Sequence, residues 1–123
     1  MTVTVPPTAS AFEPIAAPFL LTIDVGAGRV EIHGDFERAR LEAFLDAVRL
    51  LEYSPSPSWS IDVSAVDFCD AGGLRGLLIA RRLAEQNGRT LRVTQAGRWM
   101  SRLLPMIGLS ASEASSRFLR PVN

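Results

Sequence analysis

The clearest alternation of apolar and polar side chains lies at Trp59–Ser64, where every second residue is apolar. A period of two is typical of a strand with one buried face. Two glycines then interrupt the pattern, and from Leu74 onward apolar residues recur at helical spacing. We therefore predict a strand, a tight loop and a helix that ends near residues 87–88, with Asp70 as the helix N-cap.

The same two periods predict three further strands and two further helices. The strands are expected at residues 19–25, 29–33 and 90–95, and the helices at residues 36–51 and from about residue 98 to residue 107. Glycines at positions 26 and 28 turn the first two strands into an antiparallel hairpin. Gly34 is expected to end the second strand.

The resulting order of elements, β-β-α-β-α-β-α, makes the last three strands parallel, because a helix joins each to the next. Every strand alternates instead of being apolar throughout, so we expect the helices to cover only one face of the sheet. The open face would carry Thr22, Glu31, Asp62 and Arg92. Of these, Asp62 and Arg92 are expected to pair across neighbouring strands.

The two ends of the chain lack these periods. Residues 1–18 hold four of the eight prolines, and we expect them to form a flexible Pro-rich arm. Phe12 or Ile15 could press this arm onto the domain. Residues 110–123 are expected to form a tail or a short helix, which places the domain at residues 19–109.

Composition adds limits on function. With 47% hydrophobic and 21% charged residues and a formal net charge of zero, the chain is typical of a soluble globular domain without a basic surface for nucleic acid. Neither a targeting signal nor a membrane span is evident. The single cysteine, Cys69, fits a reducing compartment. We therefore expect a cytoplasmic protein, with neither nucleic acid nor membrane as a partner.

The motifs around the third strand resemble those of the STAS domain, the fold of bacterial anti-sigma-factor antagonists. The matching stretches are Asp62-Val63-Ser64, Val66-Asp67-Phe68, Asp70-Ala71-Gly72-Gly73-Leu74, Gly34-Asp35-Phe36-Glu37 and Gly108-Leu109. Their order and spacing agree with the family over residues 19–109. The resemblance implies an α/β fold with a mixed four- to five-stranded sheet, an N-terminal β-hairpin and helices packed mainly on one face.

The chain departs from the family pattern at the regulatory position. In the family, the serine after the aspartate is phosphorylated by a partner kinase that is also the anti-sigma factor. That position is Ala71 here, the next serine is replaced by Gly72, and the small residue after the leucine is replaced by Arg75. The resemblance thus implies no phosphorylation site here. It implies a partner-binding surface formed by Asp70, Ala71, Gly72, Gly73, Leu74 and Arg75.

Three of these positions, Asp70 and the two glycines, have both a structural and a functional interpretation. Asp70 either caps the helix or orients the loop toward a partner and holds a partner's cation. The glycines that follow either permit a tight turn or expose N–H groups to an anion.

Other single residues are interpreted structurally. Cys69 is expected to be a buried thiol, because no histidine or basic residue in the motif would lower its pKa. His33, the only histidine, is expected on the surface, and Trp59 and Trp99 are expected in the core.

Neither a carboxylate pair, a metal-ligand spacing, a phosphate-binding loop nor a nucleophile elbow is visible, so we expect neither an enzyme, a cofactor nor a metal. The leading hypothesis is a non-catalytic interaction module in bacterial regulation, whose partner is an anti-sigma factor or a kinase-like regulatory protein. The alternatives are a small-anion or nucleotide sensor and a non-phosphorylatable scaffold subunit of a larger signalling complex. Homodimer formation is left open.

Overall fold

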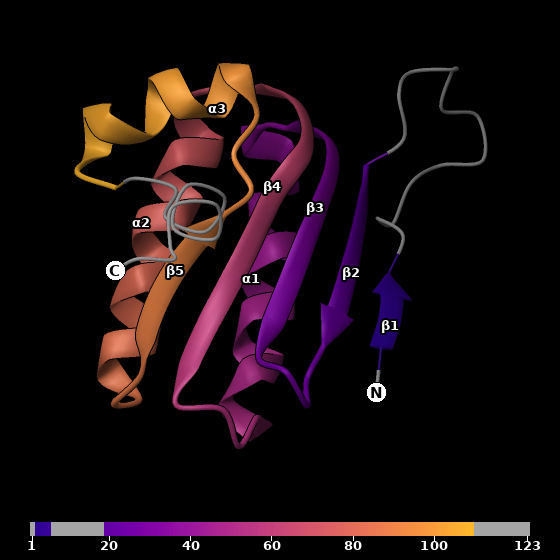
Figure 1. Cartoon of the computed structure of the whole chain (residues 1–123). Helices are drawn as coiled ribbons and strands as arrows, with labels where there is room; N and C mark the ends of the chain where they lie inside the picture. Colours follow the sequence, from indigo (N-terminus) through magenta and orange to yellow (C-terminus); the bar gives the residue numbers. More distant parts are fainter. Residues whose placement is uncertain (1, 6–18, 110–123) are drawn as a thin grey trace, which may run out of the picture.

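The computed structural model describes residues 2–5 and 19–109, which form a mixed five-stranded sheet and three α-helices (Figure 1). The α/β fold expected from the sequence is confirmed. The strands are β1 (Thr2–Val5), β2 (Leu20–Asp24), β3 (Arg29–Phe36), β4 (Ser58–Cys69) and β5 (Thr90–Thr94). The helices are α1 (Leu41–Leu50), α2 (Ala71–Gln86) and α3 (Arg98–Leu103), with the 3-10 turns η1 (Arg38–Arg40), η2 (Leu51–Tyr53) and η3 (Leu104–Ile107).

The strands are ordered β1-β2-β3-β4-β5 across the sheet, as they are along the chain. The first two pairings are antiparallel and the last two are parallel. The predicted hairpin is β2–β3, and α1 and α2 are the connections between the parallel strands.

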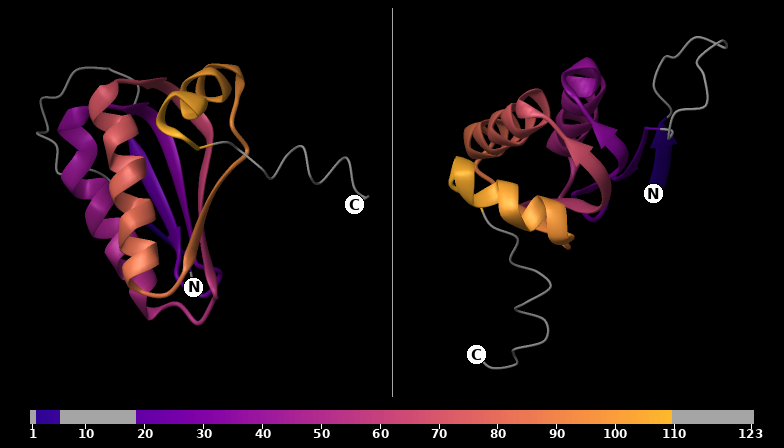
Figure 2. Two further views of the ribbon diagram at one scale, coloured as in Figure 1. Left: turned by 90° about the vertical axis from the view of Figure 1, so that its left-hand side faces the viewer. Right: turned by 90° about the horizontal axis from the view of Figure 1, so that it is seen from above.

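Both long helices lie on one face of the sheet, whereas α3 lies across the end of the sheet where β4 and β5 finish (Figure 2). The alternation of apolar residues explains this arrangement, because their side chains all point to the covered face. They are Leu21, Ile23, Val30, Ile32, Ile61, Val63 and Val93, each almost fully buried. Burying one such side chain contributes roughly 1.5–3 kcal/mol, so the one-sided sheet follows from the pattern.

Two predicted boundaries are wrong. Gly34 does not end a strand, because β3 continues through Phe36, and the first helix starts only at Leu41, after η1. The reason is local irregularity: the pairing of β3 with β4 shifts register twice, and Gly34 takes a φ of 96°. Glycine tolerates this conformation, so the strand can pass through the irregularity and still bury Phe36. Strand β4 includes the alternating residues 59–64 and continues to Cys69.

The N-terminal strand β1 was not predicted, because residues 1–18 were expected to form a flexible arm. Thr2–Val5 form β1, which pairs with β2 from Thr2 opposite Asp24 to Val5 opposite Leu21. The rest of the expected arm, including Phe12 and Ile15, and the expected tail at residues 110–123 lie outside the described residues.

The two tryptophans have different environments. Trp59 is fully buried, as expected, but Trp99 is 43% exposed and stacks on exposed Phe68 with ring centroids 6.5 Å apart. The expectation for Trp99 is therefore wrong. Helix α3 and the turn after it bury Met100 and Leu104, which lie one and five positions after Trp99, so Trp99 falls outside the buried stripe.

Candidate functional site

Asp70 caps helix α2 and fastens it to another part of the chain. Its Oδ1 accepts a hydrogen bond from the backbone N–H of Gly73 (2.9 Å), which confirms the predicted N-cap. Its Oδ2 accepts from the backbone N–H of Arg38 (3.2 Å), and its own N–H donates to the carbonyl of Phe36 (3.4 Å). The carboxylate thus holds the start of α2 against the segment that joins β3 to α1.

The two glycines after Asp70 make this approach possible. A Cβ atom on Gly72 would lie 2.5 Å from Cβ of Arg38, and one on Gly73 would overlap the carbonyl oxygen of Phe36. Neither contact is tolerable for a real side chain. The steric interpretation of the glycines is therefore confirmed, and the neighbour they accommodate is the chain's own backbone.

A shallow groove of about 640 Å³ lies beside the first turn of α2. Its walls come from α2, from η1 and from the start of α1, and we call it the α2 groove: Arg38, Leu41, Ala71, Gly72 and Arg75. Ala71 is the first residue of α2 and is exposed to solvent.

The structure divides the six residues that the resemblance places on a partner-binding surface. Ala71, Gly72 and Arg75 line the α2 groove. Gly73 is buried, Leu74 is half-buried against the core, and Asp70 is turned toward the backbone N–H groups that it caps. Arg38 and Leu41 were not predicted, because about 30 residues separate them from Ala71 in sequence. The adjacent glycines indicate a close approach but not the segment that approaches.

The groove carries two positive charges. Arg38 and Arg75 are both exposed, and among residues 2–5 and 19–109 no carboxylate lies within ion-pair distance of either guanidinium. Arginine is charged at every physiological pH and presents donors in a planar fork that matches a carboxylate or a phosphate. The α2 groove therefore presents two cations to solvent.

Cys69 lies behind this turn and is buried, as expected. Burial, with a smaller contribution from the charge of Asp70, raises the pKa of its thiol from 9.0 to about 12. The thiolate is the reactive form of cysteine, so a pKa this high makes the side chain a poor nucleophile.

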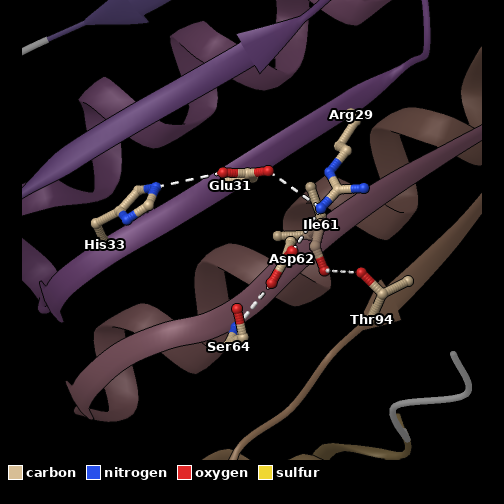
Figure 3. A network of polar contacts seen from close by, with 7 residues as sticks. All are labelled: Arg29, Glu31, His33, Ile61, Asp62, Ser64 and Thr94. Carbon is tan, nitrogen blue, oxygen red and sulfur yellow. Dashed lines mark hydrogen bonds and ion pairs between the residues drawn. The ribbon is translucent and has the colours of Figure 1, made fainter. Parts of the chain in front are cut away.

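The open face of the sheet carries a polar network on β3 and β4 (Figure 3). Arg29 donates from Nη2 to Oδ2 of Asp62 (2.6 Å) and lies 3.1 Å from Oε2 of Glu31. Asp62 is only 7% exposed, and its Oδ1 accepts from the backbone N–H of Ser64 (2.8 Å). His33 lies on the same face with Nε2 3.4 Å from Oε1 of Glu31.

The predicted pair of Asp62 with Arg92 is wrong, because Asp62 is bound by Arg29 on the other neighbouring strand. Asp62 lies opposite Thr94 on β5, and Arg92 lies opposite Ser60. On the other side of β4, Asp62 lies directly opposite Glu31, and Arg29 neutralises both carboxylates.

Neither a cluster of metal ligands nor a membrane-spanning helix is found in the described ranges 2–5 and 19–109. No three His, Cys, Asp or Glu side chains come together there as a metal site would require. None of the helices there combines the length and the hydropathy needed to cross a bilayer.

Comparison with known proteins identifies the family of the chain. The family model described as "Mlab, STAS domain" matches residues 19–120, and no curated protein matches the chain. The match covers most of the sequence, including β2 to β5 and all three helices. The chain therefore belongs to the STAS domain family and is a regulatory and interaction domain.

Proposed function

We propose that this STAS domain is a non-catalytic, anti-sigma-factor-antagonist-like module of bacterial regulation. It binds a kinase-like anti-sigma factor at the α2 groove, and it is not switched by phosphorylation at the position of Ala71. The observation that carries the proposal is the placement of Ala71, exposed at the first residue of α2 on the wall of that groove.

The groove is well suited to docking because its frame is fixed before a partner arrives. Asp70 joins Arg38 and Gly73 through its two carboxylate oxygens, and the glycines allow the two segments to touch. A rigid surface loses less conformational entropy on binding than a loop that must first be ordered.

The residue at position 71 removes the phosphorylation switch of the family from this position. The methyl group of Ala71 cannot accept a phosphoryl group. A phosphate adds nearly two negative charges, which weaken an interface by repulsion and desolvation. Arg38 and Arg75 border the same groove, so a negative charge placed at position 71 would also occupy these cations in place of a partner.

Affinity capture followed by calorimetry tests the proposal. The chain of 123 residues is used as bait in native bacterial lysate, the captured protein is identified by mass spectrometry, and its affinity for purified variants is measured. We expect a protein with a kinase-like ATP-binding fold. Ala71→Glu should weaken its binding at least tenfold, whereas Ala71→Ser should bind normally and become phosphorylated if the partner is an active kinase.

The matched control is Ala27→Glu, which adds the same charge at an exposed position of the β2–β3 turn. Equal affinity of Ala71→Glu, Ala27→Glu and the wild type would exclude the groove as the interface. Phosphate incorporated into the wild type near this loop, for example at Ser64, would show that the chain is switched by another residue.

One observation favours a second function, the sensing of a nucleotide or another small anion. Arg38 and Arg75 supply positive charge beside a helix N-terminus, which is a common anion site. However, the N–H groups of Gly73 and Leu74 already donate to Asp70. Titration of the purified chain with ATP distinguishes the functions: binding at the groove would favour the sensor. Capture of several proteins without a kinase-like fold would instead favour a scaffold subunit.

A further inference from the structure

We infer that the α2 groove recognises a carboxylate side chain of the partner protein, held between the guanidinium groups of Arg38 and Arg75 and followed by an apolar side chain that contacts Leu41. The inference rests on the proposed function, because it assigns a partner chemistry to the same surface.

The backbone brings the two arginines to one groove. Arg75 follows Ala71 by four residues on α2, so both lie on the same side of that helix. Arg38 comes from η1, whose backbone can approach only because position 72 has no side chain. Gly72 thus positions Arg38 beside α2.

The described part of the chain leaves these two charges unneutralised. Three acidic residues adjoin groove residues in sequence, Glu37, Glu42 and Asp70, and none of them lines the groove. Asp70 directs both carboxylate oxygens to backbone N–H groups. Arg49 and Arg29, in contrast, each have a carboxylate partner. Charge complementarity therefore calls for an acidic group on the occupant.

The shape of the groove favours a protein side chain over a free anion. Leu41, Ala71 and Gly72 add apolar surface to the same groove, and the groove of about 640 Å³ is far larger than one carboxylate or phosphate. A free anion would leave this apolar surface exposed to water. An acidic residue next to an apolar one would satisfy the guanidinium groups and cover the leucine.

A peptide library displayed on phage tests this chemistry even while the partner is unidentified. Random dodecapeptides are selected on the immobilised chain of 123 residues and counter-selected on the double variant Arg38→Glu/Arg75→Glu. We expect the selected peptides to contain Asp or Glu next to an apolar residue. Their affinity, measured by calorimetry, should fall at least tenfold with each single reversal.

The matched control is Arg92→Glu, which reverses an exposed arginine on the open face of the sheet. It should bind the selected peptides like the wild type. Peptides without acidic enrichment, or peptides that bind the double variant as well as the wild type, would overturn the inference. Displacement of the selected peptides by inorganic phosphate or ATP at micromolar concentration would also overturn it, in favour of a small-anion site.

The two proposals fail in different ways. If acidic peptides bind but no kinase-like partner is captured, the proposed function is wrong and the groove chemistry stands. If the captured partner responds to Ala71→Glu but is unaffected by Arg38→Glu and Arg75→Glu, the interface stands and the carboxylate contact is wrong.

Discussion

Two surfaces of this domain present arginine side chains, and they use them differently. On the open face of the sheet, Arg29 is held by Asp62 and Glu31, so its charge is satisfied within the fold. In the α2 groove, Arg38 and Arg75 have no carboxylate partner among the described residues. The first arginine stabilises the strand pairing, and the other two are available to a partner.

The comparison shows that residue type alone does not tell whether an arginine stabilises the fold or is available to bind a partner. Glu31 and Asp62 lie directly opposite each other on β3 and β4, which would be repulsive without Arg29 between them. The five residues that line the α2 groove include no acid, so the arginines there do not compensate anything within the groove. The following predictions test this difference, from the largest expected effect to the smallest.

The region behind the groove should be closed to reagents. With its pKa raised to about 12, the Cys69 thiol should have a thiolate fraction at pH 8 about a thousandfold below that of a thiol with the ordinary value of 9.0. We expect iodoacetamide to label the native protein slower by at least that factor. The control is the same protein unfolded in guanidinium chloride, where its one cysteine should react normally. Fast labelling of the native protein would mean that the frame of the groove opens readily.

The close approach beneath the groove should be intolerant of a side chain. Gly73→Ala should cost about 3 kcal/mol of the free energy of unfolding, because its Cβ would overlap the carbonyl of Phe36 and lie 2.8 Å from Sγ of Cys69. Chemical denaturation measures the loss. Gly97→Ala is the matched control, since the nearest atom to its Cβ is 3.9 Å away, and it should be nearly neutral. Equal stability of the two variants would contradict the packing described for α2.

The arginine on the open face should matter for stability. Arg29→Ala should lower the free energy of unfolding by about 1–2 kcal/mol, because it leaves Glu31 and the largely buried Asp62 facing each other without a cation. The effect should be read from denaturation at neutral pH, with Arg92→Ala as the control on the same face. A loss no greater than that of Arg92→Ala would remove the structural role from this network.

The arginine of the groove should not matter for stability. Arg75→Glu should change the free energy of unfolding by no more than about 0.5 kcal/mol, since its side chain is exposed and has no ion-pair partner to lose among the described residues. The same denaturation series gives the answer. A larger loss would show that Arg75 serves the fold, as Arg29 does, and would weaken the comparison between the two surfaces.

Local patterns in the sequence were sufficient to predict most elements. The alternation at residues 59–64 and the helical spacing from Leu74 predict β4 and α2, because burial of one face requires those periods. The cap at Asp70 is also predictable, since the hydrogen bond to Gly73 spans only three residues. Interactions of this kind depend on neighbours along the chain.

Features that depend on distant neighbours could not be predicted. The sequence around Gly34 is compatible with the end of a strand and with an irregular position inside one. Only the pairing of β3 with β4 distinguishes these two possibilities. Asp62 has arginines available on both sides, since Arg29 and Arg92 both lie opposite Ser60. Arg29 lies on the side where Glu31 is opposite Asp62 and binds both carboxylates, which no local pattern in the sequence specifies. The position of Arg38 in the groove depends on which segment packs against Gly72, and no local pattern specifies that segment.

The order of strands across the sheet has a consequence for how the domain folds. Because the spatial order is the order along the chain, each strand from β2 onward adds to the edge left by the one before it. None of the five described strands has to be inserted between two that are already paired. The sheet can therefore grow in one direction during synthesis, and this order allows β4, which precedes α2, to pair with β3 before the first turn of α2 needs its support from Phe36 and Arg38.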